Sequence, residues 1–250
     1  MKKFPQLTLL FWFMKICATT LGETLGDLLS MTLKIGYAYS SIIVLTFFLV
    51  SLFIQLSANF YKPFLYWFVI VATSTVGTTC SDFMNRTLEL GYANGSLILS
   101  IILVFNFFIW KLNETSLSVI NIKTVKGEIF YWVSILISNT LGTSLGDFIT
   151  EYLNLGFFGG VLIIGSLLLV IAFSYQLKIF SETLLFWLAF VLTRPFGATF
   201  GDLLTKSNEF GGLNIGTISS TFILSIILGI FILLEYFRMD QNDSKIFLKN

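Results

Sequence analysis

One eight-residue pattern occurs four times in this chain and constrains its fold more than any other feature. Each copy ends in an aspartate, with a tryptophan fifteen residues before it, a glycine five before it and another glycine nine after it. No gap is needed to align the copies, which are residues 20–27, 75–82, 140–147 and 195–202. Self-similarity of this kind predicts an array of similar structural units.

The spacing of the copies has its own regularity. Successive aspartates are 55, 65 and 55 residues apart, so Asp27 to Asp147 and Asp82 to Asp202 are each 120 residues. This indicates a two-helix unit that doubled twice. We therefore expect one half over residues 1–120, a second half over 121–240, and a cytoplasmic tail over 241–250.

The composition places these units in a membrane. Hydrophobic residues make up 56% of the 250-residue chain and charged residues only 12%, whereas soluble domains carry about 25% charged residues. A membrane-spanning helix needs about 20 apolar residues, and eight segments satisfy this. We thus predict an all-α integral membrane protein with transmembrane helices near residues 7–29, 36–57, 64–86, 91–110, 129–150, 156–176, 183–205 and 213–236.

Since each repeat contains two spans, all four repeats point the same way across the membrane. Such parallel repeats are pseudo-symmetric about an axis along the membrane normal. Ten basic residues fall on the side of the termini and three on the other, which predicts that both termini are cytoplasmic. The ten are Lys2, Lys3, Lys62, Lys111, Lys123, Lys126, Lys178, Arg238, Lys245 and Lys249, and the three are Lys34, Arg86 and Lys206.

The repeated aspartates are the first candidates for function. A lipid-facing Asp at the membrane centre costs about 2.5–3.5 kcal/mol, so we expect all four to face a shared, protein-lined interior. Glu23 adds a fifth carboxylate, and a hydroxyl precedes each aspartate by three residues. The predicted cation- or proton-binding residues are Asp27, Asp82, Asp147, Asp202, Glu23, Thr24, Thr79, Ser144 and Thr199.

The charge balance of the predicted spans requires compensation. The five acids face only two bases, Lys15 and Arg194, which leaves −3 if all are ionised. Crowded carboxylates in a low-dielectric site must bind protons or cations. Oxygen ligands suit Mg, Ca, Mn or alkali ions, and the absence of His argues against zinc or copper. We expect the four aspartates to be the metal ligands and no cofactor beyond such a cation. We expect Arg194 and Lys15 to be counter-ions, with Arg194 paired with Asp202.

Structural alternatives remain open at each position. Gly22, Gly77, Gly142 and Gly197 belong to small-xxx-small motifs, which allow close helix packing. The aspartates could cap short helices. The hydroxyls could bond backwards to their own helix, and the tryptophans could serve as interface anchors or as packing.

The fourfold Trp/Gly/Asp register, with two membrane segments per copy, resembles a bacterial family of four tandem two-helix repeats of unknown function, the uncharacterised membrane-anchored proteins. The resemblance covers nearly the whole chain. It implies a multi-pass protein of the bacterial inner membrane and supplies no activity.

Function is therefore predicted from the residues themselves. We expect a transporter or exporter of a small inorganic cation, divalent by preference, with proton coupling as an option. The alternatives are a cation channel with a carboxylate ring and a non-transporting scaffold or lipid-binding protein. An enzyme is not expected, because no nucleophile–His pair exists without His. Expected partners are membrane lipids and cations or protons; no basic block suggests nucleic acid, and a homo-oligomer is left open.

Overall fold

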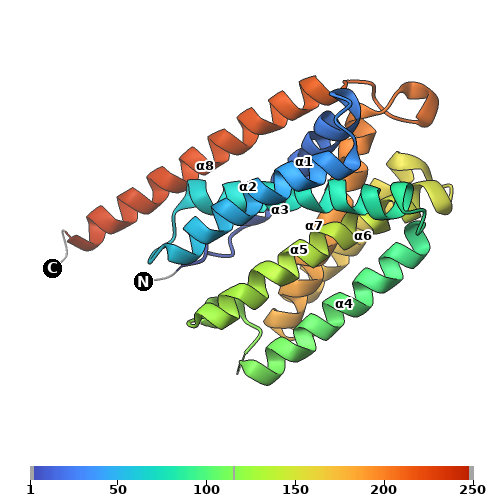
Figure 1. Ribbon diagram of the computed structural model, residues 1–250. Helices are drawn as coiled ribbons and strands as arrows, with labels where there is room; N and C mark the ends of the chain where they lie inside the picture. Colours follow the sequence, from blue (N-terminus) through green and yellow to red (C-terminus); the bar gives the residue numbers. More distant parts are fainter. Residues whose placement is uncertain (1–2, 115, 248–250) are drawn as a thin grey trace.

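The computed structural model describes residues 3–114 and 116–247, with side chains through Met239. These residues form eight α-helices, one for each predicted span (Figure 1). They are α1 (Leu9–Asp27), α2 (Tyr37–Ser57), α3 (Pro63–Asp82), α4 (Tyr92–Asn113), α5 (Val125–Asp147), α6 (Gly156–Gln176), α7 (Glu182–Thr205) and α8 (Thr217–Phe247). Helix α8 starts later than expected and continues into the segment predicted as a tail. Lys2 and Lys249 lie outside the described residues, as does the side chain of Lys245.

Four helices form a closed inner ring. Helix α1 packs on α3, α3 on α5, α5 on α7, and α7 returns to α1. The other four helices lie outside this ring. Each outer helix packs on the inner helix of the following repeat, α2 on α3, α4 on α5 and α6 on α7, and α8 closes the circuit on α1. The two helices of a repeat therefore do not form a self-contained hairpin, because each repeat completes its packing with the next.

Repeated glycines let the inner helices approach closely. At each of the four, an added Cβ would overlap a residue of the next inner helix, eight positions before that helix's aspartate. The pairs are Gly22 with Ser74, Gly77 with Asn139, Gly142 with Arg194, and Gly197 with Thr19. The same contact is thus made at every junction of the ring, and backbone approach of this kind needs a residue without a side chain.

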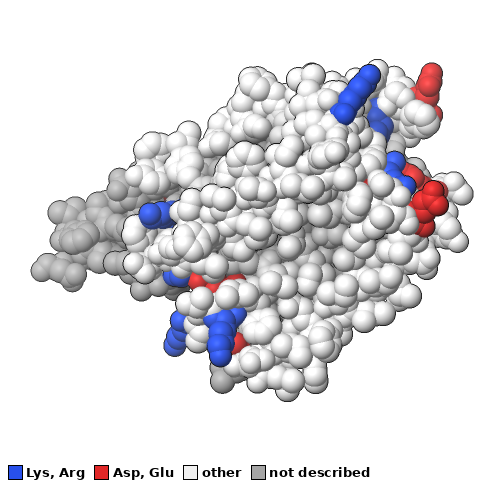
Figure 2. All heavy atoms as spheres, viewed as in Figure 1, with Lys and Arg blue, Asp and Glu red and all other residues white. Residues whose placement is uncertain are grey.

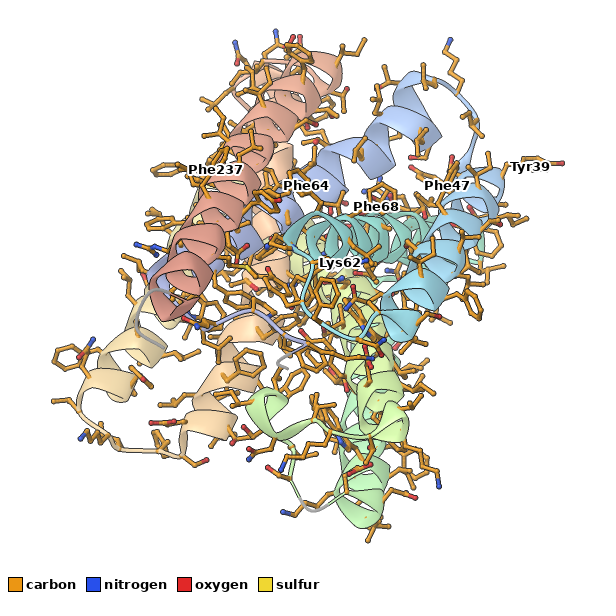
Figure 3. All side chains as sticks on the ribbon, turned by 90° about the vertical axis from the view of Figure 1, so that its left-hand side faces the viewer. Tyr39, Phe47, Lys62, Phe64, Phe68 and Phe237 are labelled. Carbon is orange, nitrogen blue, oxygen red and sulfur yellow. The ribbon has the colours of Figure 1, made fainter. Side chains whose placement is uncertain are left out.

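The outer surface of the bundle is apolar. Seven of the helices in the described part are long and apolar enough to cross a membrane. The exception is α1, which has 19 residues and contains Lys15, Glu23 and Asp27, yet it occupies the same ring position as α3, α5 and α7. Large exposed side chains such as Phe47 and Phe68 cover the outside (Figure 3). Charged residues gather at the two ends of the face in Figure 2, with an uncharged band between them. These features indicate a multi-pass membrane protein.

Three inner helices continue past their aspartate in a single π-helical turn. These turns are η1 (Leu28–Thr32), η2 (Phe83–Thr87) and η4 (Phe148–Tyr152). A glycine with positive φ follows each turn and leads into the outer helix: Gly36 (84°), Gly91 (76°) and Gly156 (65°). Glycine adopts this conformation without steric cost.

The fourth repeat differs from this pattern. Helix α7 ends at Thr205 without a π turn, and Gly216 (φ 85°) precedes α8. The equivalent glycine was expected at Gly211, which instead caps a short 3₁₀ turn, η5 (Asn208–Phe210). The five additional residues account for the late start of α8.

The repeat tryptophans pack inside the protein. Trp67 and Trp132 are at most 1% exposed and lie in an aromatic cluster near the end that holds the termini. Within this cluster the hydroxyls of Tyr66 and Tyr131 share a 2.6 Å hydrogen bond. The packing alternative therefore describes these two residues better than the interface alternative.

Candidate functional site

The inner ring stacks its polar side chains in layers along its axis. The four aspartates form one layer, and the residues four, eight and twelve positions before them form three more. No residue of these four layers is more than 5% exposed. The first of the three further layers contains Glu23, Thr78, Thr143 and Ala198; the second Thr19, Ser74, Asn139 and Arg194; the third Lys15, Ile70, Ile135 and Phe190. A column of buried polar groups thus runs from the aspartates toward the termini and ends at a largely apolar layer.

One guanidinium group holds the centre of this column. Arg194 Nη1 and Nη2 each donate to Glu23 Oε2 at 2.9 Å. Arg194 Nη2 also lies 2.6 Å from the hydroxyl of Thr78 and 2.6 Å from that of Thr143. Because these residues come from α7, α1, α3 and α5, all four inner helices meet at one charge pair. Arg194 is 0% exposed and Glu23 is 3% exposed.

This arrangement corrects the counter-ion assignments. Arg194 was expected to serve Asp202, but its partner is Glu23. Lys15 was expected to be a second counter-ion, but among the described residues its Nζ has no hydrogen-bond partner. That atom lies 3.9 Å from the centroid of the Phe190 ring, a geometry in which the ring face attracts a cation.

The four aspartates form two pairs, each bridged by one base. Lys206 Nζ lies 2.6 Å from Asp27 Oδ2 and 3.2 Å from Asp202 Oδ1. On the other side of the ring, Arg86 bridges Asp82 at 3.1 Å and Asp147 at 3.9 Å, and it also reaches Glu151 at 3.2 Å. We call these groups the Lys206 clamp and the Arg86 clamp.

The sequence predicted both bridging bases on the side of the membrane opposite the termini and did not count them among the charges of the spans. Each in fact turns back onto the aspartate four residues before it. Such i,i+4 spacing places acid and base on one helix face, so the sequence did contain the signal for this contact. The partner from the neighbouring repeat could not be read from spacing.

Lys206 lies just past the end of α7. Burial alone would lower the pKa of Lys206, but Asp202 and Asp27 outweigh this and raise its pKa above the usual value. The ammonium therefore remains charged and holds α7 and α1 together.

The described residues contain no group of three or more acidic, Cys or His side chains that could hold a metal ion. The expected metal site formed jointly by Asp27, Asp82, Asp147 and Asp202 is therefore not present. The physical reason is that the carboxylates separate into two pairs, each facing a base.

The predicted hydroxyl ligands are bonded elsewhere. Thr24, Thr79 and Thr199 donate to carbonyls of their own helices, as the back-bonding alternative describes. Ser144 donates to Tyr92 O. The hydroxyls that reach the central charges belong instead to Thr78 and Thr143.

The capping alternative also fails for three of the aspartates. Asp27, Asp82 and Asp147 have helical backbone angles, and their side chains make no cap hydrogen bond to the turn that follows. They lie inside continuous helical segments and are held by the clamps.

A closed ring of four helices around buried charges, wrapped by four apolar helices, defines a helical repeat protein of the multi-pass membrane class. The chain belongs to the family described as Repeat of Unknown Function (DUF347), which matches residues 10–61, 65–116, 130–178 and 185–240. This confirms the four tandem repeats predicted from the sequence. Comparison with curated proteins and with solved structures found no significant match.

Proposed function

We propose that this protein is a carrier that moves a small monovalent cation, a proton or an alkali ion, across the membrane along the axis of the inner ring. The observation that carries the proposal is the buried column of ionisable groups, to which every inner helix contributes. Ionisable residues inside a membrane protein are costly and characteristically mark ion pathways.

The charge balance of the column favours a monovalent ion. Five buried acids (Glu23, Asp27, Asp82, Asp147 and Asp202) lie with four bases (Lys15, Arg86, Arg194 and Lys206), so the fully ionised column has a charge of −1. Glu151, which also contacts Arg86, is exposed to solvent and is not counted. One proton or one alkali ion would neutralise it. The preference for a divalent cation rested on a net charge of −3 in the predicted spans. It loses its support once the charges of Arg86 and Lys206 are included.

The two clamps suggest how the column could open. The Lys206 clamp joins the first repeat to the fourth, and the Arg86 clamp joins the second to the third. Both clamps therefore bridge the two duplicated halves, as does the pair of Arg194 with Glu23. Breaking these contacts would free one half to move relative to the other, which is how parallel-repeat carriers alternate access.

Glu23 is the acid whose protonation would release the most contacts. Its Oε2 atom accepts from Arg194 and from the Thr78 hydroxyl. A proton bound there removes the charge that holds Arg194, and Arg194 can then interact with the aspartate layer. Glu23 thus binds the transported or co-transported proton, and Arg194 responds to it.

A closed layer at one end of the column favours a carrier over a channel. Lys15, Ile70, Ile135 and Phe190 are each 0% exposed and close the column below Arg194. Passage through this layer needs movement of the helices, which favours a carrier over a permanently open pore. The scaffold alternative has support of its own, because every aspartate is engaged in an ion pair.

We further propose the bacterial inner membrane as the location, with both termini in the cytoplasm as the distribution of Lys and Arg predicts. The protein then has no enzymatic role. Its partners are lipids and the transported ion.

Flux into vesicles tests the proposal. Purified full-length protein is reconstituted in vesicles. Proton uptake is followed with a pH-sensitive dye inside, and Na⁺, K⁺ and Ca²⁺ uptake with radioactive isotopes, each compared with empty vesicles under an imposed potential. We expect uptake of a monovalent ion, its loss in Glu23→Gln, and normal uptake in Glu209→Gln, whose carboxylate is exposed. Because Glu23→Gln leaves Arg194 unpaired, Glu23→Gln/Arg194→Met is measured beside it. Uptake equal to that of empty vesicles, or undiminished in the double variant, would refute the carrier and favour the scaffold.

A further inference from the structure

Helix α6 does not cover the seam between two neighbouring inner helices as completely as the other outer helices do. Equivalent positions are found by counting from the positive-φ glycine that precedes or opens each outer helix: Gly36, Gly91, Gly156 and Gly216. Twelve residues on, Phe48 of α2, Leu103 of α4 and Leu228 of α8 are 2%, 5% and 4% exposed, whereas Leu168 of α6 is only half-buried.

The difference grows toward the end that holds the termini. Nineteen residues after the glycine, Gln55 and Trp110 are 0% exposed, and Glu235 accepts hydrogen bonds from Trp67 and Tyr61. Tyr175 holds that position in α6 and is 53% exposed. Three outer helices thus insert a side chain toward the inner ring here, and α6 leaves this space unfilled.

A cavity of about 1090 Å³ occupies that space. Its walls are α1, α6, α7, the segment before α1, and the segment before α5 with the first turn of α5. Along α7 it extends from Glu182 to Thr193, which at 1.5 Å per helical residue is roughly 16 Å. One leaflet of a bilayer has a hydrocarbon depth of about 15 Å, so the cavity is as deep as one leaflet.

The polarity of the lining changes along this depth. Lys3, Lys123 and Glu182 lie at the end near the termini, and apolar residues such as Ile16, Leu168 and Ala189 line the deeper part. This change from charged to apolar lining matches the orientation of a lipid in one leaflet. Its head group would lie at the end near the termini and its acyl chains beside α6.

The charges at the rim favour an anionic head group. Glu128 is already paired with Lys3 at 2.9 Å. Glu182 lies in the first turn of α7, where the helix dipole offsets its charge. Lys123 is exposed and makes no ion pair among the residues that the structure describes, so its ammonium is available to a phosphate.

We propose that this cavity, between α6 and the α1–α7 seam, is a binding site for one anionic phospholipid from the leaflet at the terminal end. The site borders the transport column, because its deepest residues include Ile16 and Thr193, the sequence neighbours of Lys15 and Arg194. The proposal does not depend on the carrier function and is tested separately.

The test is lipid retention. Full-length protein is reconstituted in vesicles with equal amounts of phosphatidylglycerol and phosphatidylcholine of identical chains, extracted gently, and examined by native mass spectrometry. We expect one retained phosphatidylglycerol per protein. Ala189→Trp should reduce retention on the order of tenfold by filling the cavity, whereas Leu188→Trp, on the neighbouring lipid-facing position, should not.

Lys123→Gln tests the head group and does not disturb the core. We expect about a fivefold loss of phosphatidylglycerol, the effect of one basic residue near a lipid surface, and no loss in Lys126→Gln, whose exposed side chain does not line the cavity. Equal retention of both lipids by the wild type would overturn the proposal. Equal retention by Ala189→Trp and Leu188→Trp, or by Lys123→Gln and Lys126→Gln, would also overturn it.

Discussion

At the scale of single residues, the pair of Arg194 and Glu23 is the centre of the molecule. Both charges are removed from solvent, and each is stabilised only because the other is present, together with the hydroxyls of Thr78 and Thr143. Removing one member leaves a buried charge without compensation, whereas removing both does not.

This asymmetry gives the first prediction. Glu23→Gln and Arg194→Met should each lower the free energy of unfolding by about 3–5 kcal/mol, and the double variant should recover most of that loss. Unfolding in mixed detergent micelles, followed by circular dichroism, measures the three variants against the wild type. A double variant less stable than both single variants would contradict the coupling.

The sequence marked Arg194 as unusual, because Thr19, Ser74 and Asn139 hold its position in the other repeats. It did not identify the partner. The partner lies on another helix, and which acid meets the guanidinium depends on how the helices pack beside Gly142. Spacing along one chain does not contain that information.

At the scale of helices, the glycine contacts set how closely the inner ring packs. Gly77 faces the backbone of Asn139, and the carbonyl carbon of Asn139 would lie 2.7 Å from an added Cβ. Backbone cannot move aside as a flexible side chain can, so α3 and α5 would have to separate.

Gly77→Ala should therefore destabilise the protein by about 1–3 kcal/mol, the usual cost of overpacking. Gly229→Ala in α8 is the matched control, because no atom lies within 4 Å of its added Cβ. It should be neutral or stabilising by up to about 1 kcal/mol, since Ala is the better helix former. Thermal unfolding of the two variants compares them directly, and equal losses would show that the contact at Gly77 is not tight.

The Arg86 clamp predicts local order at the aspartate end. Arg86→Gln removes the base shared by Asp82 and Asp147, so the amides of η2 and η4 should exchange faster by about tenfold or more, as expected for opening a partly buried charge contact. Lys34→Gln is the control, because Lys34 is exposed and has no ion pair among the described residues. Hydrogen–deuterium exchange measures both variants, and unchanged exchange in η2 and η4 would argue against the clamp.

The helix boundaries show what periodicity can predict. The glycines at Gly36, Gly91 and Gly156 located the starts of the outer helices within one residue, because each of these positive-φ glycines precedes or opens an outer helix. The π turns after the aspartates have no sequence signature, and α8 was predicted too early because Gly211, not Gly216, lies nine residues after its aspartate as in the other repeats.

At the scale of the whole molecule, the ring is closed by contacts between its first and last repeats. Helix α8 packs on α1, and the Sγ atom of Cys17 lies 3.5 Å from the carbonyl oxygen of Leu224. Four parallel repeats around one axis were predicted from the sequence. The exchange of outer helices between repeats was not, because every outer helix is a largely apolar run and its partner cannot be read from its pattern.

Closure can be tested by cross-linking. A Leu224→Cys variant that also carries Cys80→Ser should form a disulfide with Cys17 on mild oxidation, because the Cys17 thiol already touches the backbone of residue 224. Ile223→Cys in the same background is the control, since Ile223 is 50% exposed on the outside of α8. Electrophoretic mobility after oxidation reads out the bond. Cross-linking of both variants to the same extent, or of neither, would contradict the placement of α8.

The central claim is that a monovalent cation crosses the membrane through the column around Glu23. Current recorded on a solid-supported membrane after a rapid ion jump measures this most directly, with wild type and Glu23→Gln/Arg194→Met reconstituted at equal density. The account predicts a transient current for the wild type, with a proton or an alkali ion, and none for the double variant. A wild type without current, or a double variant with the same current, would contradict it.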